Sequence, residues 1–383
     1  MKKTTIILLT LIYISFISLG LPDGLLGVGW PIMRLDFDQS LQAAGLVIII
    51  MMPLSTISSM NAARLKQRFG VGPVAFMSAL LTAISLIGIG LSASFEGLIF
   101  FSIGLGIGQG AVDALLNDVV SQHFASKHMS WLHGFWGVGA TLGPGLMTYV
   151  LSLDRGWTLG YSLVGSIQLI IAFLLFLSLP LWKKLVTTNS SPHSLEKGSF
   201  KKVMLFGIAL FFLYVGFEMS VGLWSNSVLS EYKNLPIQIS GYFVSLYYLM
   251  ITVGRFISGI ISTKLGNRIM VNAGLTLSFI GLTLLSLSNH VYLLGLGIIL
   301  TGLGFAPIYP SMMHETASRF RVNDAAIAVG YQVGVAYIGG TFVSSGFGVI
   351  LDSISLSLLY PLLAFGTLIM LGLHLTYNAR TPS

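Results

Sequence analysis

The sequence predicts an all-α membrane protein with twelve transmembrane helices in two six-helix, pseudo-symmetric halves. Of its 383 residues, 54% are hydrophobic and only 9% are charged, whereas soluble domains carry about 25% charged residues. The apolar runs are long and continuous, which excludes a membrane barrel of short alternating strands. A helical span with its turn takes roughly 30 residues, so the chain has the length for about twelve.

Polar and turn residues divide the apolar runs. The expected spans lie at about 5–33, 41–62, 72–93, 96–122, 131–153, 158–182, 201–227, 238–264, 270–288, 291–318, 323–350 and 354–377. A polar stretch separates the sixth span from the seventh. The expected organisation is therefore an N-terminal bundle at 1–182, a linker loop at 183–200 and a C-terminal bundle at 201–383.

Positive charge between the spans predicts the orientation, because cytoplasmic loops carry more Lys and Arg. With the N-terminus inside, 16 of the 20 Lys and Arg residues lie on the inner side and three on the outer side. We therefore expect a multi-pass protein of the cell membrane with both termini and the central loop in the cytoplasm. The first apolar run is longer than that of a secretory signal, so we expect it to be retained.

The two halves repeat each other at nearly constant spacing. Three glycine positions recur at offsets of 196, 198 and 196: Gly134 and Gly330, Gly104 and Gly302, Gly20 and Gly216. Parallel six-helix halves are the plan of a large class of transporters.

Two of the predicted cytoplasmic loops carry related motifs. Residues 63–70 read ARLKQRFG and residues 259–268 read GIISTKLGNR. These resemble the loop 2–3 and loop 8–9 signature of the major facilitator superfamily, with Gln67 and Thr263 in place of its acidic residue. The resemblance covers essentially the whole chain. Whether the two changed loops form the family's charge-paired latch stays open.

Finer features are similar to the fucose:proton symporter family. They are residues 21–27 with Trp30-Pro31 in the first span, and residues 214–218 with Gly222 and Trp224 in the seventh. The fourth span has Asp113 and Asn117 where that family has Glu and then Asn-Pro. This resemblance implies a small polar solute, a sugar or sugar-like molecule, that moves with a cation. We expect a proton, with sodium as the alternative, and no further cofactor.

Asp23 is the first candidate residue, because a charge near the bilayer centre costs about 3 kcal/mol. Pro22 and the surrounding glycines predict a local break in the span that opens it towards a cavity. We expect Asp23 to contact the solute and to share in proton coupling.

Gln109, Asp113 and Asn117 are spaced by four and form one stripe on the fourth span. Helix packing alone is a sufficient reason for Gln109. Helix packing does not require a titratable group such as the Asp113 carboxyl. A poorly solvated carboxyl group can take up and release a proton near neutral pH. We therefore expect Asp113 to carry the coupling proton and the two amides to bind solute.

Arg255 and Glu218 are charged residues inside the eighth and seventh spans. Arg255 requires a partner, for which Asp113 or another cavity acid is the candidate; otherwise its side chain reaches the inner surface. A pair with Asp113 would join the two halves and act as a gate. Glu218 is expected to bind solute or the cation.

Aromatic and amide side chains suit the apolar faces and hydroxyls of a sugar, although many aromatic residues pack between helices or at the membrane interface. The remaining expected solute contacts are Trp136, Trp224, Tyr248 and Gln332.

Three functions compete at this point. The first is proton-coupled import of a polar solute, and the second is proton-coupled export of drugs or metabolites on the same fold. The third is an intramembrane enzyme or a sensor. The enzyme has little support, since the chain has no Cys and no clustered His that could form a nucleophile or a metal site. Nothing in the composition indicates nucleic acid as a partner, and we expect a monomer in the lipid bilayer.

Overall fold

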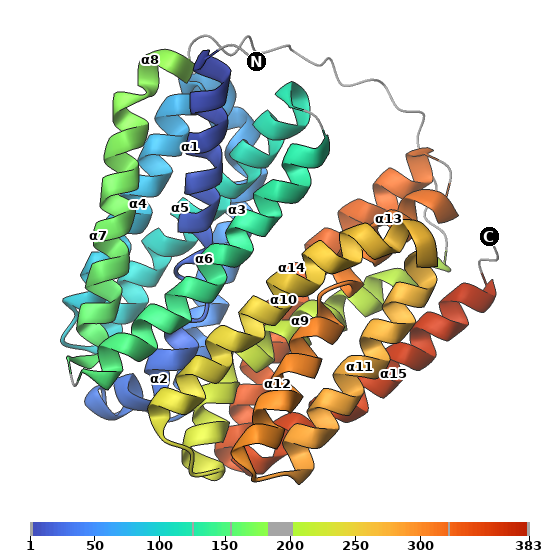
Figure 1. Ribbon diagram of the computed structural model, residues 1–383. Coiled ribbons are helices and arrows are strands. Elements are labelled where there is room, and N and C mark those ends of the chain that lie inside the picture. The colour runs from blue at the N-terminus through green and yellow to red at the C-terminus, as the bar shows by residue number, and fades with distance from the viewer. Residues whose placement is uncertain (1–2, 125, 154, 183–201, 321, 381–383) are drawn as a thin grey trace. The chain divides into compact units, whose positions relative to one another are not determined.

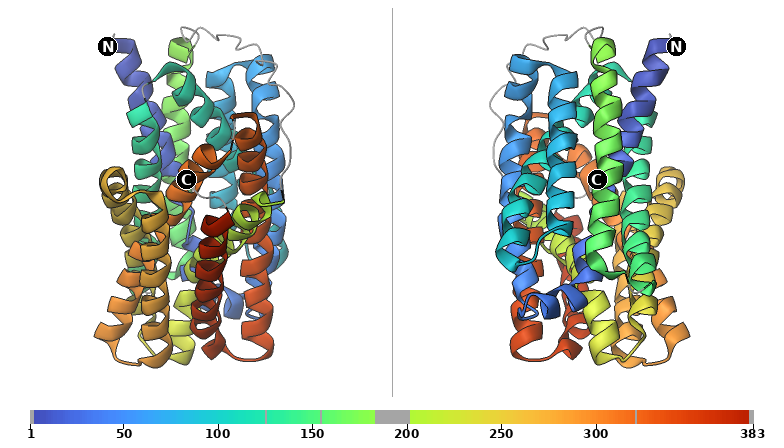
Figure 2. Two further views of the ribbon diagram at one scale, coloured as in Figure 1. Left: turned by 90° about the vertical axis from the view of Figure 1, so that its right-hand side faces the viewer. Right: turned by 90° about the vertical axis from the view of Figure 1, so that its left-hand side faces the viewer.

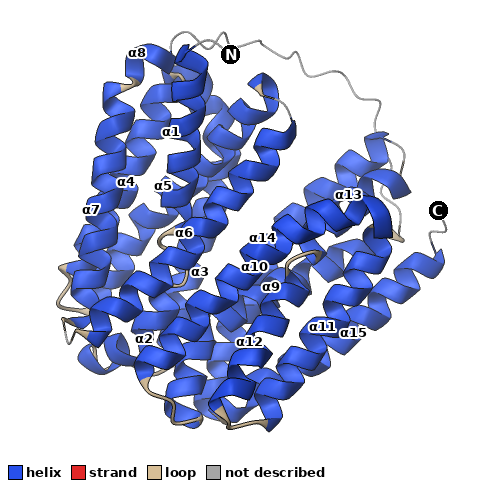
Figure 3. Ribbon diagram, viewed as in Figure 1, coloured by secondary structure: helices blue, strands red, loops and turns tan. Residues whose placement is uncertain are grey.

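A computed structural model describes residues 3–124, 126–153, 155–182, 202–320 and 322–380. Every regular element in these ranges is a helix, and none of the residues described is in a strand (Figure 3). Helices satisfy their backbone groups internally, as the lipid interior requires. The predicted all-α membrane fold is confirmed.

The chain forms two compact units, Met1–Thr188 and Asn189–Ser383. The predicted linker at 183–200 lies outside the described residues.

The helices of each unit follow the predicted spans closely (Figure 1). Unit 1 contains α1 (Lys3–Gly20), α2 (Leu25–Asp36), α3 (Ala43–Phe69), α4 (Val71–Gly90), α5 (Phe95–His123), α6 (Ser126–Ser152), α7 (Gly156–Leu177) and α8 (Leu179–Trp182). Unit 2 contains α9 (Met204–Ser227), a π-helical turn (Val228–Tyr232), α10 (Ile237–Leu265), α11 (Asn267–Leu287), α12 (Val291–Phe305), α13 (Ile308–Arg319), α14 (Val322–Ser353), a 3-10 turn (Leu356–Leu358) and α15 (Leu359–Arg380).

Eleven of the described helical segments are long and apolar enough to cross a membrane. The remaining predicted span corresponds to α6, which is 27 residues long. Its glycines, Trp136 and Pro144 lower its mean hydropathy, although its length suffices to cross the bilayer.

The tenth span lies where the sequence predicts it, since Val291–Thr316 is one of the eleven apolar segments. It is interrupted, because α12 ends at Phe305 and α13 begins at Ile308. Pro307 explains the interruption, because proline has no N–H to donate to the carbonyl four residues before it.

The two halves share a backbone feature where their second and third spans meet. Gly70 (φ 86°) precedes α4 and Gly266 (φ 78°) precedes α11. Both glycines lie in the left-handed region that other residues rarely adopt. Their spacing of 196 residues matches the predicted duplication.

Glycines also bring helices of unit 1 into close contact. In unit 1, α1 runs beside α6 and α3 beside α5 (Figure 1, Figure 2). A Cβ at Gly110 of α5 would collide with the backbone of Ser55, and one at Gly143 of α6 with that of Leu21. Small residues allow such close packing of helices in lipid.

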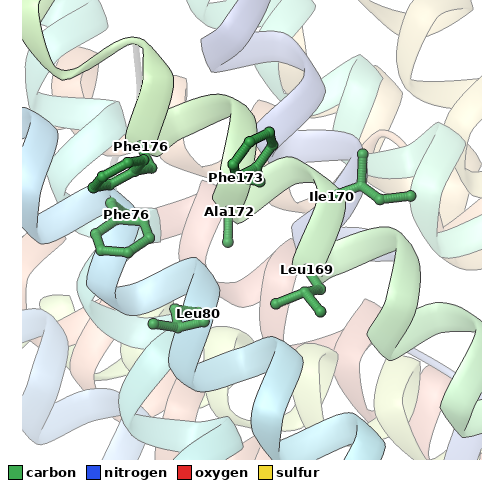
Figure 4. A pocket seen from close by; sticks show the side chains of 7 residues that line it. All are labelled: Phe76, Leu80, Leu169, Ile170, Ala172, Phe173 and Phe176. Carbon is green, nitrogen blue, oxygen red and sulfur yellow. The ribbon is translucent and has the colours of Figure 1, made fainter.

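An apolar groove of about 520 Å³ lies between α4 and α7. Figure 4 shows its lining of Phe76, Leu80, Leu169, Ile170, Ala172, Phe173 and Phe176. These side chains offer no hydrogen-bonding group, so the groove suits lipid chains and not a polar solute.

Candidate functional site

The first span is broken where the sequence predicts it. Helix α1 ends at Gly20, and four residues in turns precede α2 at Leu25. Gly24, the last of the four, has φ 77° and allows the chain to turn into α2. Asp23 therefore lies in a turn between two helices, where its side chain is half-buried.

Trp136 of α6 holds the carboxylate of Asp23. Its Nε1 donates a hydrogen bond to Asp23 Oδ2 at 2.9 Å. Both side chains are half-buried. Two predicted solute-contact residues, 113 positions apart in the chain, therefore meet at the break.

The stripe on the fourth span is present on α5. Gln109, Asp113 and Asn117 are all half-buried there. Asn117 Nδ2 donates to the backbone oxygen and to Oδ1 of Asp113, each at 3.0 Å. The Asp113 carboxyl group therefore accepts a hydrogen bond from a neutral amide on its own helix, and its role as proton carrier stays a prediction.

One of the changed loop motifs does form a charge pair. Lys66, near the end of α3, contacts Asp118 Oδ2 of α5 at 2.7 Å. The Asp118 side chain is 41% exposed, so solvent screens this pair. The pair lies within unit 1.

Arg255 has an acidic partner, as its depth in the eighth span requires. Its Nη2 lies 3.1 Å from Oε1 of Glu218 on α9, and the two side chains are 23% and 12% exposed. Tyr247 donates to the backbone oxygen of Glu218 at 3.1 Å. This pair belongs to unit 2 alone and does not link the two halves, so the gating role of Arg255 stays a prediction.

Two other predicted solute contacts are packed inside unit 2. Trp224 is fully buried, and its Nε1 donates to the Ser344 backbone oxygen at 2.8 Å. Gln332 is 1% exposed and accepts a hydrogen bond from Thr316 at 2.9 Å. These contacts connect helices, which is the packing role that sequence alone could not separate from solute binding.

Tyr248 is half-buried. Its hydroxyl lies where a Cβ at Gly222 would be, and its ring meets that of Tyr247 edge to face. Gly222 therefore makes room for Tyr248 beside the residues around Glu218.

Sequence reasoning missed a second buried charge cluster in unit 2. Glu315 Oε2 of α13 lies 2.6 Å from Arg319 and 3.3 Å from His374 Nε2 of α15. Arg268 lies 4.0 Å from the other carboxylate oxygen, and Asn378 accepts from Arg319. The spacing of Glu315 and Arg319 by four was the available signal.

Comparison with known proteins gives the family. The sequence profile of the Major Facilitator Superfamily matches residues 12–206 and 206–383. The chain is 24% identical to Bypass of stop codon protein 6 of Saccharomyces cerevisiae, over 92% of this chain and 78% of that one. It is 26% identical to the cis,cis-muconate transport protein of Acinetobacter baylyi (82% and 81% covered) and 22% identical to the class H tetracycline resistance protein of Pasteurella multocida (77% and 76% covered).

Solved structures share the fold at low sequence identity. The nucleoside transporter NupG superposes with a TM-score of 0.78 and 12% identity, over 96% of this chain and 98% of that chain. A D-xylose-proton symporter superposes with a TM-score of 0.71 and 15% identity, over 95% and 96%. With nearly its whole length matched by the profile and its all-helical fold shared with these transporters, the chain belongs to the major facilitator superfamily.

Proposed function

We propose that the protein is a secondary active transporter that moves a sugar or sugar-like polar solute across the cell membrane by proton symport with alternating access. The resemblance of its first, fourth and seventh spans to the fucose:proton symporter family supports the solute class. A xylose-proton symporter and a nucleoside transporter among its structural neighbours are consistent with a hydroxyl-rich solute.

The observation that carries this proposal is the contact between Asp23 and Trp136 at the break of the first span. A carboxylate accepts hydrogen bonds from hydroxyl groups. An indole adds a large apolar face beside it. The N–H groups of Leu21 and Asp23 and the carbonyl groups of Pro22 and Gly24 already form hydrogen bonds with neighbouring backbone. The side chains of Asp23 and Trp136 are therefore the groups that we propose for the solute.

Asp113 and the Glu218–Arg255 pair have separate roles in this proposal. Asp113 takes up the proton, because its bonding partner Asn117 is neutral and leaves the carboxyl group able to hold a proton. Glu218 and Arg255 form a pair of opposite charges within unit 2 and are not assigned the coupling proton. Gln109 and Asn117 offer amide groups to the solute within unit 1, and a solute contact is also proposed for Tyr248 of unit 2.

Proton-coupled export of drugs or metabolites is the alternative. Its support is the 22% identity to a tetracycline resistance protein. An exporter of bulky cations is expected to have a wide apolar cavity, whereas the acidic candidates Asp23, Asp113 and Glu218 each have a specific polar or charged partner.

Proteoliposomes that contain the purified protein and an internal pH dye test the proposal. We expect addition of one member of a panel of neutral hexoses, pentoses and nucleosides to acidify the lumen. A dicarboxylate and a bulky cationic drug serve as controls for other solute classes. If the drug alone moves protons, the export alternative replaces symport; if none of the sugars or nucleosides does, the solute class is wrong.

The proposal includes a monomer. It also places both termini in the cytoplasm, since 16 of the 20 Lys and Arg residues then lie inside. A reporter that is fluorescent only in the cytoplasm should be active at either terminus. If the reporter is fluorescent at one terminus and not at the other, the two termini lie on opposite sides of the membrane, which would contradict an even number of spans.

A further inference from the structure

The break in the first span leaves a backbone carbonyl without its helical donor. In a continuous helix the Ser18 oxygen would accept from the N–H of residue 22. Residue 22 is proline and has no N–H. The next donors turn elsewhere, since Asp23 N–H bonds to the Gly20 oxygen at 3.0 Å.

Gln168 of α7 supplies the missing donor. Its Nε2 lies 2.8 Å from the Ser18 oxygen, and its side chain is 1% exposed. Its Oε1 has no hydrogen-bond partner among the described residues. A buried amide with an unused acceptor costs stability. The hydrogen bond from Gln168 Nε2 to the Ser18 carbonyl is the favourable contact that offsets part of this cost.

The two sides of the broken turn are fixed by different helices. Trp136 of α6 holds the Asp23 carboxylate, and Gly143 of α6 lies against the Leu21 backbone. Gln168 fixes the last turn of α1 from α7. The path of the chain from the end of α1 to Asp23 therefore depends on the contact of Trp136 with Asp23 and on that of Gln168 with Ser18.

Unit 2 provides an internal comparison. Residue 218, at the offset of 196 from Pro22, is Glu218, and α9 continues through it to Ser227. The corresponding carbonyl keeps its helical donor. At the same offset of 196, the residue in the place of Gln168 is Ala364 of α15. The half without the proline also lacks the glutamine.

We infer that Gln168 is a positioning residue that sets the location of Asp23 by binding the Ser18 carbonyl freed by Pro22. The importance of this location for transport rests on the proposed function. The geometry itself does not, because it concerns only the contacts within unit 1.

The test measures Asp23 without any solute. Dicyclohexylcarbodiimide modifies protonated carboxyl groups in apolar surroundings, and mass spectrometry of peptides gives the rates at Asp23 and at Asp113 in one sample. Gln168→Met has a similar length but no donor. Pro22→Ala restores an N–H at residue 22, so the double variant shows whether Gln168 acts through the Ser18 carbonyl.

With Pro22 present, we expect Gln168→Met to raise the labelling rate at Asp23 relative to Asp113 by about threefold; in the Pro22→Ala background, the same substitution should change it by less than about 1.5-fold. An effect that is absent with Pro22, or that persists in the Pro22→Ala background, overturns the inference. If Gln168→Met does not purify as a folded protein, Gln168→Leu serves in the same comparison, because leucine also has no group that can donate to the Ser18 carbonyl. If no solute of the panel is transported, the proposed function is refuted. The labelling experiment still tests the role of Gln168, because it uses no solute.

Discussion

Removal of one partner of the Glu218–Arg255 pair should destabilise unit 2 more than removal of both. At the observed 3.1 Å separation the attraction is about 5 kcal/mol for an effective dielectric constant of about 20. Desolvation of the two charges offsets much of this gain. A single neutralised partner leaves the other charge poorly solvated and unbalanced, which costs about 3 kcal/mol.

We therefore expect Glu218→Gln and Arg255→Met each to lower the free energy of unfolding by about 3 kcal/mol, and the double variant to lower it by less than either single variant does. Titration with sodium dodecyl sulfate in mixed micelles measures these values. Lys264→Gln, on an exposed part of α10 in the same unit, is the control and should change the free energy by less than about 0.5 kcal/mol. Additive single effects would refute the assignment of a coupled ion pair.

Three further variants test other parts of the structure. Asp113→Asn should abolish uphill transport and leave solute exchange in part intact, as measured by counterflow in proteoliposomes; full uphill transport would exclude Asp113 as proton carrier. Glu315→Gln leaves the buried Arg319 without its carboxylate and should cost about 3–5 kcal/mol in the same micelle titration, so a loss below about 1 kcal/mol would contradict the buried cluster. Lys66→Gln should cost less than about 1 kcal/mol because its partner Asp118 is 41% exposed, and a larger loss would mean that this pair is not screened by solvent.

The spans could be predicted because the bilayer imposes a length and an apolar composition on each one. Acidic residues inside these spans were visible for the same reason, since a charge in an apolar run is rare. The break at Pro22 followed from the chemistry of proline. The interruption at Pro307 has the same cause but was overlooked in a span that otherwise reads as continuous.

The contacts between side chains were harder to predict, because they depend on which helices pack together. Glu218 was named as a solute contact and Arg255 as a gate, but their distance of 37 residues gave no sign that they pair. Trp224 and Gln332 are expected to bind solute, and the structure shows that both join helices within unit 2, so their solute contacts stay predictions. Aromatic and amide residues serve both purposes in membrane helices, so their type alone does not decide.

No sequence feature distinguishes Gln168 as a functional residue. A glutamine in an apolar span resembles any other interhelical hydrogen-bonding residue. Its partner is a backbone carbonyl 150 positions away, which no sequence pattern marks.

The central claim, proton symport of a polar solute, is tested most directly by accumulation against an imposed pH gradient. Proteoliposomes are loaded with an alkaline buffer and diluted into an acidic one. The acidic buffer contains, in labelled form, the sugar or nucleoside whose addition acidified the lumen. Proton symport predicts accumulation above the external concentration and its loss when a protonophore is added. Accumulation that occurs only when the lumen is the acidic side would contradict symport and indicate proton antiport.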